Sequence, residues 1–393
     1  MQVCGVICEY NPFHKGHALH LARARAESGA DYVVCAMSGA AVQRGVFARH
    51  DKWIRARMAL ESGCDLVLEL PARFSAAPAP EFAAGGVHLL SALGVLTHLS
   101  FGCEAESLPH IHAAAELLSE ETPAFRQALR AGLNQGLPYP RARALAAQQI
   151  SGISGLADCI SRPNAALAVE YLRALPKPVT PVPVVREGGG YHDDALGDLS
   201  SATAIRAALD RGKLEDALSA VPCPDLLAAA EARGDTHEEE ALTLALLCRL
   251  RTMTAQELSA IAGMEEGLEH RFIAAAKVAQ SRNELILSVK SKRYTYARLS
   301  RLCMNILLGV TKEFADLHSA PTYARVLGFR RDAQPLLRAI KDSGSIPLVT
   351  KAADYDDPLF ALDLRAQDLW SLGCANPALR RAGRDYTTGP VIF

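Results

Sequence analysis

The chain has 393 residues, of which 49 % are hydrophobic, and its formal net charge is −1 at pH 7. The length exceeds what one hydrophobic core usually serves, so we expect two or three domains, and the composition excludes a disordered chain. The longest apolar stretches, such as residues 64–71, fall far short of the ~20 residues that a membrane helix needs, so we expect no membrane partner.

The N-terminus reads as a first strand, because Val3 to Cys8 follow the start without a basic leader or a cleavage site. We therefore expect a cytoplasmic protein. The ten cysteines stand in apolar surroundings and form no Cys-x-x-Cys pair, which is typical of reduced core residues. We predict no metal-binding side chains and infer no protein partner.

The first two hundred residues alternate strand and helix patterns, which predicts an α/β fold with a Rossmann-like, doubly wound parallel sheet. Strands are expected at residues 3–8, 31–37, 65–70, 98–101 and 179–185. Helices are expected at residues 17–28, 52–62, 80–93, 107–118, 123–131, 141–149 and 164–175. In such sheets ligands bind beyond the carboxyl ends of the strands, so the loops after strands are the candidates for a site.

After Arg211 helical periodicity prevails, so we predict a catalytic domain at residues 1–210 and a mainly helical domain at residues 211–393. Its helices are expected at residues 225–233, 237–253, 265–281, 291–308 and 359–372, with short extended runs at 322–329 and 346–350. Charge changes abruptly within this half. Residues 210–269 carry 13 acidic and 5 basic residues, whereas residues 270–341 carry 14 basic and 4 acidic ones.

A histidine pair follows the first strand directly, in the run Glu9-Tyr10-Asn11-Pro12-Phe13-His14-Lys15-Gly16-His17. A helix start presents unpaired N–H groups and a partial positive charge, and a glycine there lets phosphate approach the backbone. His14 and His17 can donate hydrogen bonds to phosphoryl oxygens as charge builds up, with Lys15 assisting. The strand, loop and helix together resemble the HxGH form of the HIGH motif, which points to a nucleotidyltransferase; the alternative is that both histidines merely cap the helix.

Further segments, in order along most of the chain, resemble one family within that superfamily, the tRNA(Met) cytidine acetate ligases. They are residues 5–17, 37–39, 42–45, 51–53, 65–71, 101–104, 162–164, 168–172, 200–206 and 292–296. The resemblance implies that acetate attacks the α-phosphate of ATP to give acetyl-adenylate and pyrophosphate, without acetyl-coenzyme A. The N4 atom of the wobble cytidine of elongator tRNA(Met) then takes the acetyl group. Mg²⁺ is expected with the phosphates.

The resemblance and the strand-end loops together define a candidate ATP site. Its predicted residues are Ile7, Cys8, Glu9, Tyr10, Asn11, Pro12, Phe13, His14, Gly16, His17, His20, Gly102, Asn164, Arg186, Ser201, Thr203 and Arg206, with His14, His17 and Lys15 as the catalytic ones. Several have a plainer alternative: Gly102 as a turn glycine, Asn164 and Ser201 as helix caps. The fixed charge and planar fork of Arg186 suit a phosphate.

The basic segment supplies a candidate RNA surface. We predict that Lys290, Lys292, Arg293, Arg298 and Arg301, several of them on one helical side, neutralise RNA phosphates, while Tyr294 and Tyr296 stack on an unpaired base. The alternative is that these arginines pair with the acidic stretch at residues 210–269.

Two departures from the family pattern lie near the expected site. Ala40 and Ala41 stand where the family commonly has a polar residue followed by Phe, and Ala165 stands where a second asparagine is usual. Two other functions therefore stay open. One is a nucleotidyltransferase acting on a phosphorylated small molecule, and the other is a catalytically degenerate RNA-binding protein.

Overall fold

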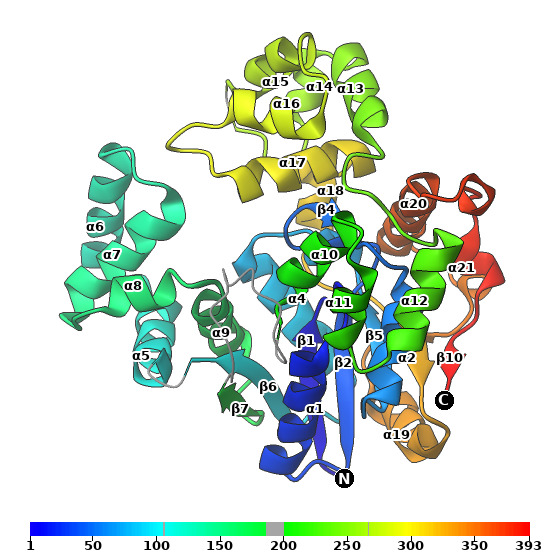
Figure 1. Ribbon diagram of the computed structural model, residues 1–393. Coiled ribbons are helices and arrows are strands. Elements are labelled where there is room, and N and C mark those ends of the chain that lie inside the picture. The colour runs from blue at the N-terminus through cyan, green and yellow to red at the C-terminus, as the bar shows by residue number, and fades with distance from the viewer. Residues whose placement is uncertain (105–106, 186–199, 266) are drawn as a thin grey trace.

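The computed structural model describes residues 1–104, 107–185, 200–265 and 267–393. Within these ranges the main sheet has the strand order β10-β8-β5-β2-β1-β6-β7, and β9 pairs with β8 (Figure 1). The parallel part comprises β1 (Val3–Cys8), β2 (Tyr32–Ser38), β5 (Leu66–Leu70), β6 (His98–Cys103) and β7 (Thr180–Val185). These are the strands expected from the sequence, with ends that differ by one or two residues.

Three strands from the end of the chain extend this sheet. They are β8 (Ala324–Phe329), which pairs antiparallel with β5, and the two strands parallel to β8, namely β9 (Leu348–Val349) and β10 (Val391–Ile392). A short hairpin of β3 (Ala41–Val42) and β4 (Val46–Phe47) follows β2. The boundary at residue 210 stays a prediction, but the chain after residue 323 contributes strands to the first half's sheet as well as helices.

Helices cover both faces of the sheet because successive strand residues point to opposite sides. Val34 and Ala36 belong to a core formed with α4 and α9, whereas Val33 and Cys35 belong to a core formed with α1 and α2. The covering helices on the first face include α3 (Ala72–Ser75), α4 (Ala79–Ser91), α9 (Pro163–Ala174), α19 (Gln334–Ser343) and α20 (Pro358–Leu372). Those on the second face are α1 (Lys15–Ser28), α2 (Lys52–Glu61), α10 (Ala202–Asp210), α11 (Leu214–Ser219) and α12 (Pro224–Arg233).

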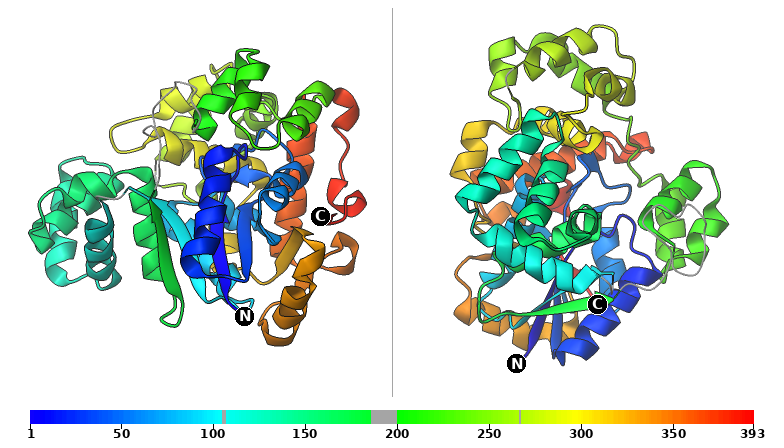
Figure 2. Two further views of the ribbon diagram at one scale, coloured as in Figure 1. Left: turned by 60° about the horizontal axis from the view of Figure 1, so that its bottom comes forward. Right: turned by 90° about the vertical axis from the view of Figure 1, so that its left-hand side faces the viewer.

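Two groups of helices project from this α/β body (Figures 1 and 2). The first lies beside β6 and β7 and contains α5 (Leu108–Ser119), α6 (Pro123–Asn134), α7 (Tyr139–Ser151) and α8 (Leu156–Ile160). The second, which we call the helical lobe, contains α13 (Thr243–Thr252), α14 (Ala255–Ser259), α15 (Leu268–Ala276), α16 (Arg282–Val289), α17 (Tyr296–Leu308) and α18 (Lys312–Leu317). Remaining short elements are η2 (Arg331–Ala333), η3 (Ala352–Asp354), η4 (Pro377–Leu379) and α21 (Arg384–Thr387).

The expected helices of the lobe are shorter than the sequence pattern indicated. The helix expected at residues 265–281 stops at Ala276, and Ser281 caps the next helix by accepting the Glu284 N–H at 3.0 Å. The helix expected from residue 291 starts only at Tyr296, where Thr295 is the N-cap and accepts the Arg298 N–H at 3.4 Å. Side-chain caps, which satisfy the free N–H groups of a helix start, therefore set these boundaries.

Candidate active site

The HxGH loop lies between the carboxyl end of β1 and the start of α1. His14 is the N-cap of α1, its own N–H donates to Nδ1 of His17 at 3.3 Å, and the two rings stack with centroids 3.6 Å apart. Because Nδ1 of His17 accepts this bond, a neutral His17 carries its proton on Nε2 and can donate it. The structure thus brings both predicted catalytic histidines together at a helix start.

Buried aromatic side chains support the histidine pair from behind. The Tyr10 ring lies 4.8 Å from the His17 ring and 4.6 Å from the Phe13 ring, measured between centroids. Tyr10 has a positive φ of 51° and is 1 % exposed, and its hydroxyl lies 3.4 Å from Sγ of Cys35. Tyr10 and Phe13, like the buried Pro12, were predicted to bind ATP; their side chains form part of the core, so only the backbone of this stretch is available to a ligand.

The second predicted phosphate motif, Ser201 to Arg206, packs directly onto the HxGH loop. Arg206 donates to the carbonyl of Asn11 and, from its second nitrogen, to the hydroxyl of Thr203 at 3.3 Å. Ser201 is the N-cap of α10 and accepts the Ala204 N–H at 3.1 Å, which is the ordinary capping role weighed for it. The distant α10 is therefore joined to the loop by a guanidinium.

The predicted nucleotide-binding residues of β6 and α9 lie along the same edge of the sheet. Gly102 is in β6, and Asn164, in the first turn of α9, donates to Oε1 of Glu104 at 3.2 Å. His20 lies on α1, where Nε2 is 3.0 Å from the Ser100 hydroxyl of β6.

The remaining predicted binding residues surround the loop or fall outside the description. Ile7 packs against Gly86 of α4, where an added Cβ would lie 2.7 Å from Cδ1 of Ile7. Cys8 ends β1, and the backbone N–H of Lys15 donates to the carbonyl of Ala220 at 3.0 Å. Arg186 lies outside the residues that the structure describes.

Arg55 is a part of the site that the sequence did not reveal. Its guanidinium donates to the carbonyls of Glu9 at 2.7 Å, Ser38 at 2.9 Å and Gly39, and Nε donates to the carbonyl of His50 at 3.0 Å. Burial lowers its pKa to about 10. One buried cation thus connects the ends of β1 and β2 with the start of α2. The only indication in the sequence was an arginine within a mostly apolar helix pattern.

Glu9 was predicted only as one member of the ATP segment, but its carboxyl group has a defined position. Oε1 accepts the backbone N–H of Gln43 in the β3–β4 hairpin at 2.6 Å. Burial raises the pKa of this carboxyl group, while the Gln43 N–H and the charge of Arg206 act in the opposite direction.

The three alanines that depart from the family pattern are core residues. Ala40 and Ala41 are 3 % and 0 % exposed and pack with Phe47 against the helical lobe, and Ala165 is 0 % exposed in the first turn of α9. Alanine at these positions is therefore compatible with a packed site.

The basic segment differs from the stripe expected on one helical side. Lys290, Lys292 and Arg293 precede α17, and only Arg298 and Arg301 lie on it. Arg298 and, at 3.4 Å, Arg293 pair with Glu265, as the alternative proposed.

The aromatic and buried members of the same segment differ from expectation too. Tyr294 is 7 % exposed and its hydroxyl donates to Glu265 at 3.2 Å, so its ring is buried and not presented to an unpaired base as predicted. Arg301 donates to the carbonyl of Gln43 at 3.3 Å. Lys290 and Lys292 are exposed and have no ion pair within the described ranges.

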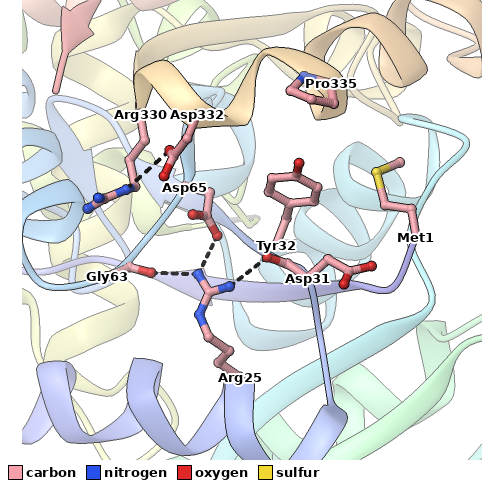
Figure 3. A pocket seen from close by; sticks show the side chains of 9 residues that line it. All are labelled: Met1, Arg25, Asp31, Tyr32, Gly63, Asp65, Arg330, Asp332 and Pro335. Atoms are coloured by element: carbon pink, nitrogen blue, oxygen red, sulfur yellow. Dashed lines mark hydrogen bonds and ion pairs between the residues drawn. The ribbon is translucent and has the colours of Figure 1, made fainter.

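A pocket of about 820 Å³ lies at the opposite, amino-terminal edge of β1, β2 and β5 (Figure 3). Arg25 at its wall pairs with Asp65 and donates to the carbonyl of Gly63 at 3.0 Å, and Arg330 pairs with Asp332 at 3.4 Å. Both arginines are already engaged by these acidic and carbonyl groups. Ligands of this fold bind at the carboxyl ends of the strands, so we do not assign ATP to this pocket at their amino ends.

Metal-binding clusters and membrane-spanning helices are both absent from the described residues. No three or more His, Cys, Asp or Glu side chains gather there in a way that could hold a metal ion. In the same residues no helix has both the length and the apolar character required to cross a bilayer.

Comparisons with known proteins agree with this geometry. The chain matches the HIGH Nucleotidyl Transferase family model over residues 1–385. It is 37 % identical to the tRNA(Met) cytidine acetate ligase of Acetivibrio thermocellus and 35 % identical to that of Clostridium perfringens, with 100 % of each chain covered.

Solved structures resemble the whole chain as well. TmcAL of Thermotoga maritima bound with alpha-thio ATP matches with a TM-score of 0.92 at 31 % identity, and its apo form with 0.93 at 31 %, both over 100 % of the two chains. The chain therefore belongs to the HIGH nucleotidyl transferase family, in the group that contains the tRNA(Met) cytidine acetate ligases.

Proposed function

We propose that this chain is an ATP-dependent ligase that acetylates N4 of the wobble cytidine of elongator tRNA(Met) through an acetyl-adenylate. The observation that carries the proposal is the HxGH loop, in which the His14 N–H holds Nδ1 of His17 at 3.3 Å. Nε2 of His17 is then a donor at a helix start, where phosphate is attracted. Acetate attack builds negative charge on the α-phosphate, which such donors stabilise.

The nucleotide would lie along the carboxyl edge of β1 and β6. Phosphates would meet the start of α1, with His14, Lys15 and His17, while Gly102 and Asn164 would hold the nucleoside side; Arg186 would add a charge. Support comes from the joining of Asn164 to Glu104 at 3.2 Å and of Arg206 to the loop carbonyl of Asn11. The similar chain from Thermotoga maritima binds an ATP analogue.

Mg²⁺ would arrive with the polyphosphate. The described residues contain no cluster of three or more side chains that could cage a metal, and Mg²⁺ commonly binds through phosphates and water with few protein ligands. The residues present are compatible with that mode, in which the ion offsets phosphate charge.

The RNA would approach from the helical lobe. Lys290 and Lys292, which are exposed in the loop before α17, would bind RNA phosphates together with Arg301, which donates to the hairpin that binds Glu9. A tRNA substrate would place the protein in the cytoplasm.

One assay tests the proposal directly. The protein is incubated with ATP, labelled acetate and elongator tRNA(Met), without coenzyme A, and the products are separated. We expect N4-acetylcytidine, AMP and pyrophosphate, together with acetate-dependent exchange of labelled pyrophosphate into ATP. An adenylyl group retained on a phosphorylated acceptor would instead establish the nucleotidyltransferase alternative, and tRNA binding without any product would establish a degenerate site.

A further inference from the structure

We propose that the Glu9 carboxylate is the catalytic residue that binds the exocyclic N4 amine of the cytosine and removes its proton during acetyl transfer. The inference rests on the proposed function, because it names the group that acts in its second step. It concerns the side chain of Glu9, as distinct from the backbone of the loop that would meet ATP.

Glu9 lies close to where the adenylate would form. Glu9 follows the last residue of β1 and lies five residues before His14, so it stands at the edge where the adenylate would form. Its carbonyl is held by Arg55 at 2.7 Å and its Oε1 by the Gln43 N–H at 2.6 Å. Backbone and carboxyl group are thus both fixed, as a proton acceptor must be if it is to meet a substrate in one orientation.

The second carboxyl oxygen of Glu9, Oε2, is available to a substrate. Glu9 is partly exposed, and its Oε2 has no hydrogen-bond partner within the described ranges. Two other glutamates at this edge differ from Glu9. Both oxygens of Glu69 accept from Lys52, at 2.9 and 2.8 Å. Oε1 of Glu104 accepts from Asn164, and its Oε2 has no partner among the described residues but is buried. Among these three carboxylates, Glu9 is therefore the one whose partly exposed side chain can accept a hydrogen bond from a substrate.

Positively charged residues around Glu9 favour the ionised form of its carboxyl group. Arg44, Arg55 and Arg206 act on it by charge and favour its ionised form against the effect of burial. The other titratable neighbours are Tyr171 of α9, whose pKa burial raises, and Cys8. The same arginines would attract the phosphate of an adenylate, so that cations hold both the leaving group and the acceptor carboxylate.

Cytosine and uracil differ in the group that they would present to a carboxylate. A carboxylate accepts hydrogen bonds from cytosine N4, whereas uracil presents an acceptor, O4, at that position. In the transfer, N4 forms a bond to the acetyl carbon and the bond from that carbon to the AMP phosphate oxygen breaks. The N4 proton passes to Oε2 of Glu9, AMP leaves, and Glu9 later returns the proton to water.

The contacts of Gln43 connect this step with the RNA surface. Its N–H binds Glu9, and its carbonyl accepts from Arg301 of α17 at 3.3 Å. The neighbouring Gly45 approaches the backbone of Ser300 and Arg301 so closely that an added Cβ would lie 2.3 Å from the Arg301 nitrogen. The hairpin thus contacts both the carboxylate and the helical lobe, from which the RNA would approach.

The test separates the two half-reactions in Glu9→Gln, which keeps an oxygen for the Gln43 N–H but cannot take a proton. We expect acetyl transfer to tRNA to fall by about 10²- to 10⁴-fold, the range for loss of a general base. Acetate-dependent pyrophosphate exchange, and trapping of acetyl-adenylate by hydroxylamine, should fall far less. Glu27→Gln, an exposed change near the end of α1, is the matched control and should transfer at the wild-type rate.

Three results would overturn the assignment. The first is a wild-type rate of acetyl transfer in Glu9→Gln. The second is an equal fall in the rates of exchange and transfer, which would place Glu9 in the ATP half-reaction. The third is a fall in the transfer rate alone in Glu104→Gln but not in Glu9→Gln. Failure of the proposed function is distinguishable, because then the wild-type protein itself would show no acetate-dependent exchange.

Discussion

The HxGH loop and the ion pairs behind it are built in opposite ways. In the loop the contacts between the histidine pair and its aromatic support join residues three to seven positions apart, as between His14 and His17 or Tyr10 and His17. The ion-pair cluster, which consists of Lys52, Glu69, Arg325 and Asp385, joins three distant parts of the chain; Lys52 and Asp385 are 333 positions apart.

The two regions also differ in their exposure. Lys52, Glu69 and Asp385 have side chains that are 0 %, 2 % and 3 % exposed, whereas His17 is half-buried at the edge of the sheet. The ion-pair cluster approaches Gly39 in the loop after β2, where an added Cβ would lie 2.1 Å from Oε1 of Glu69. Arg55 donates to the carbonyls of both Gly39 and Glu9 and so connects this loop with the start of the HxGH loop. In the proposed mechanism a local motif carries the chemistry, while a long-range cluster packs against the loop after β2. Changes in the two regions should therefore affect different quantities.

Loss of the lysine from the ion-pair cluster should have the largest effect, and it should act on stability. Lys52→Met leaves Glu69 and Asp385 buried next to each other without their shared cation, which bonds to them at 2.8 and 2.9 Å. Breaking a buried pair in this way costs about 3–5 kcal/mol. We expect the urea midpoint to fall accordingly, with the slope unchanged.

A milder variant keeps that test informative if Lys52→Met does not fold. Asp385→Asn leaves the bond between Lys52 and Glu69, so its loss should be smaller. Lys341→Met, an exposed change on α19, is the control and should unfold like the wild type. Equal midpoints for Lys52→Met and Lys341→Met would mean that the cluster contributes nothing to stability.

The histidine pair should show the reverse, a large effect on rate and a small one on stability. His14→Ala or His17→Ala removes a donor to the transition state, which typically lowers turnover by about 10²- to 10³-fold. Pyrophosphate exchange measures this step, and His112→Ala, an exposed change on α5, serves as control. Full activity in either variant would remove that histidine from the mechanism.

The contrast also explains how much could be predicted. The parallel strands, the HxGH loop at a helix start and the meeting of Asn164 with the same edge follow from short patterns, and the structure agrees with them. The addition of β8 and β10 to the sheet does not follow, since Val391 and Ile392 give no strand pattern and pair with β8 through distant contacts.

Charge counts were the weakest guide to the site. The excess of basic residues at positions 270–341 predicted one stripe, but Glu265 takes up Arg293 and Arg298, and Tyr294 is buried beneath them. A count gives the net charge of a segment, but it does not show which charged side chains pair with each other in the fold. Arg55 was missed for the same reason, because its four carbonyl partners are visible only once β1, β2 and α2 are assembled.

A pH-dependent stability should mark a second long-range contact, at His237. Burial lowers its pKa to about 4, and its Nδ1 lies 2.9 Å from the carbonyl of Trp370. Because the folded pKa lies below the unfolded value of 6.5, the unfolded chain binds the proton more tightly. The contribution of His237 to the free energy of unfolding is then fully present above about pH 6.5 and falls by ~3 kcal/mol as the pH approaches 4.

The measurement compares His237→Gln with the wild type at pH 7 and 4.5. Burial raises the pKa of Asp51 to about 6, which acts in the opposite direction over the same window, so the difference between the two proteins is the quantity of interest. The fall in the free energy of unfolding between pH 7 and 4.5 should be smaller in His237→Gln than in the wild type. His112→Gln should show the same fall as the wild type. The same loss in all three proteins would show that His237 is protonated in the folded state.

The smallest expected effect separates the open from the paired charges of the basic segment. Lys290 and Lys292 are exposed without a described ion pair, so they are free to meet RNA phosphates, whereas Glu265 already engages Arg293 and Arg298. Replacing both lysines by Ala should weaken tRNA binding on the order of tenfold and reduce the salt dependence by about two phosphate contacts. Arg293→Ala with Arg298→Ala should weaken binding less, because the RNA must first displace Glu265. Acetyl-adenylate formation should persist in both double variants, since neither changes the HxGH loop. A larger loss of affinity in the arginine pair would mean that Glu265 yields to the RNA, and unchanged affinity in both would place the RNA surface elsewhere on the molecule.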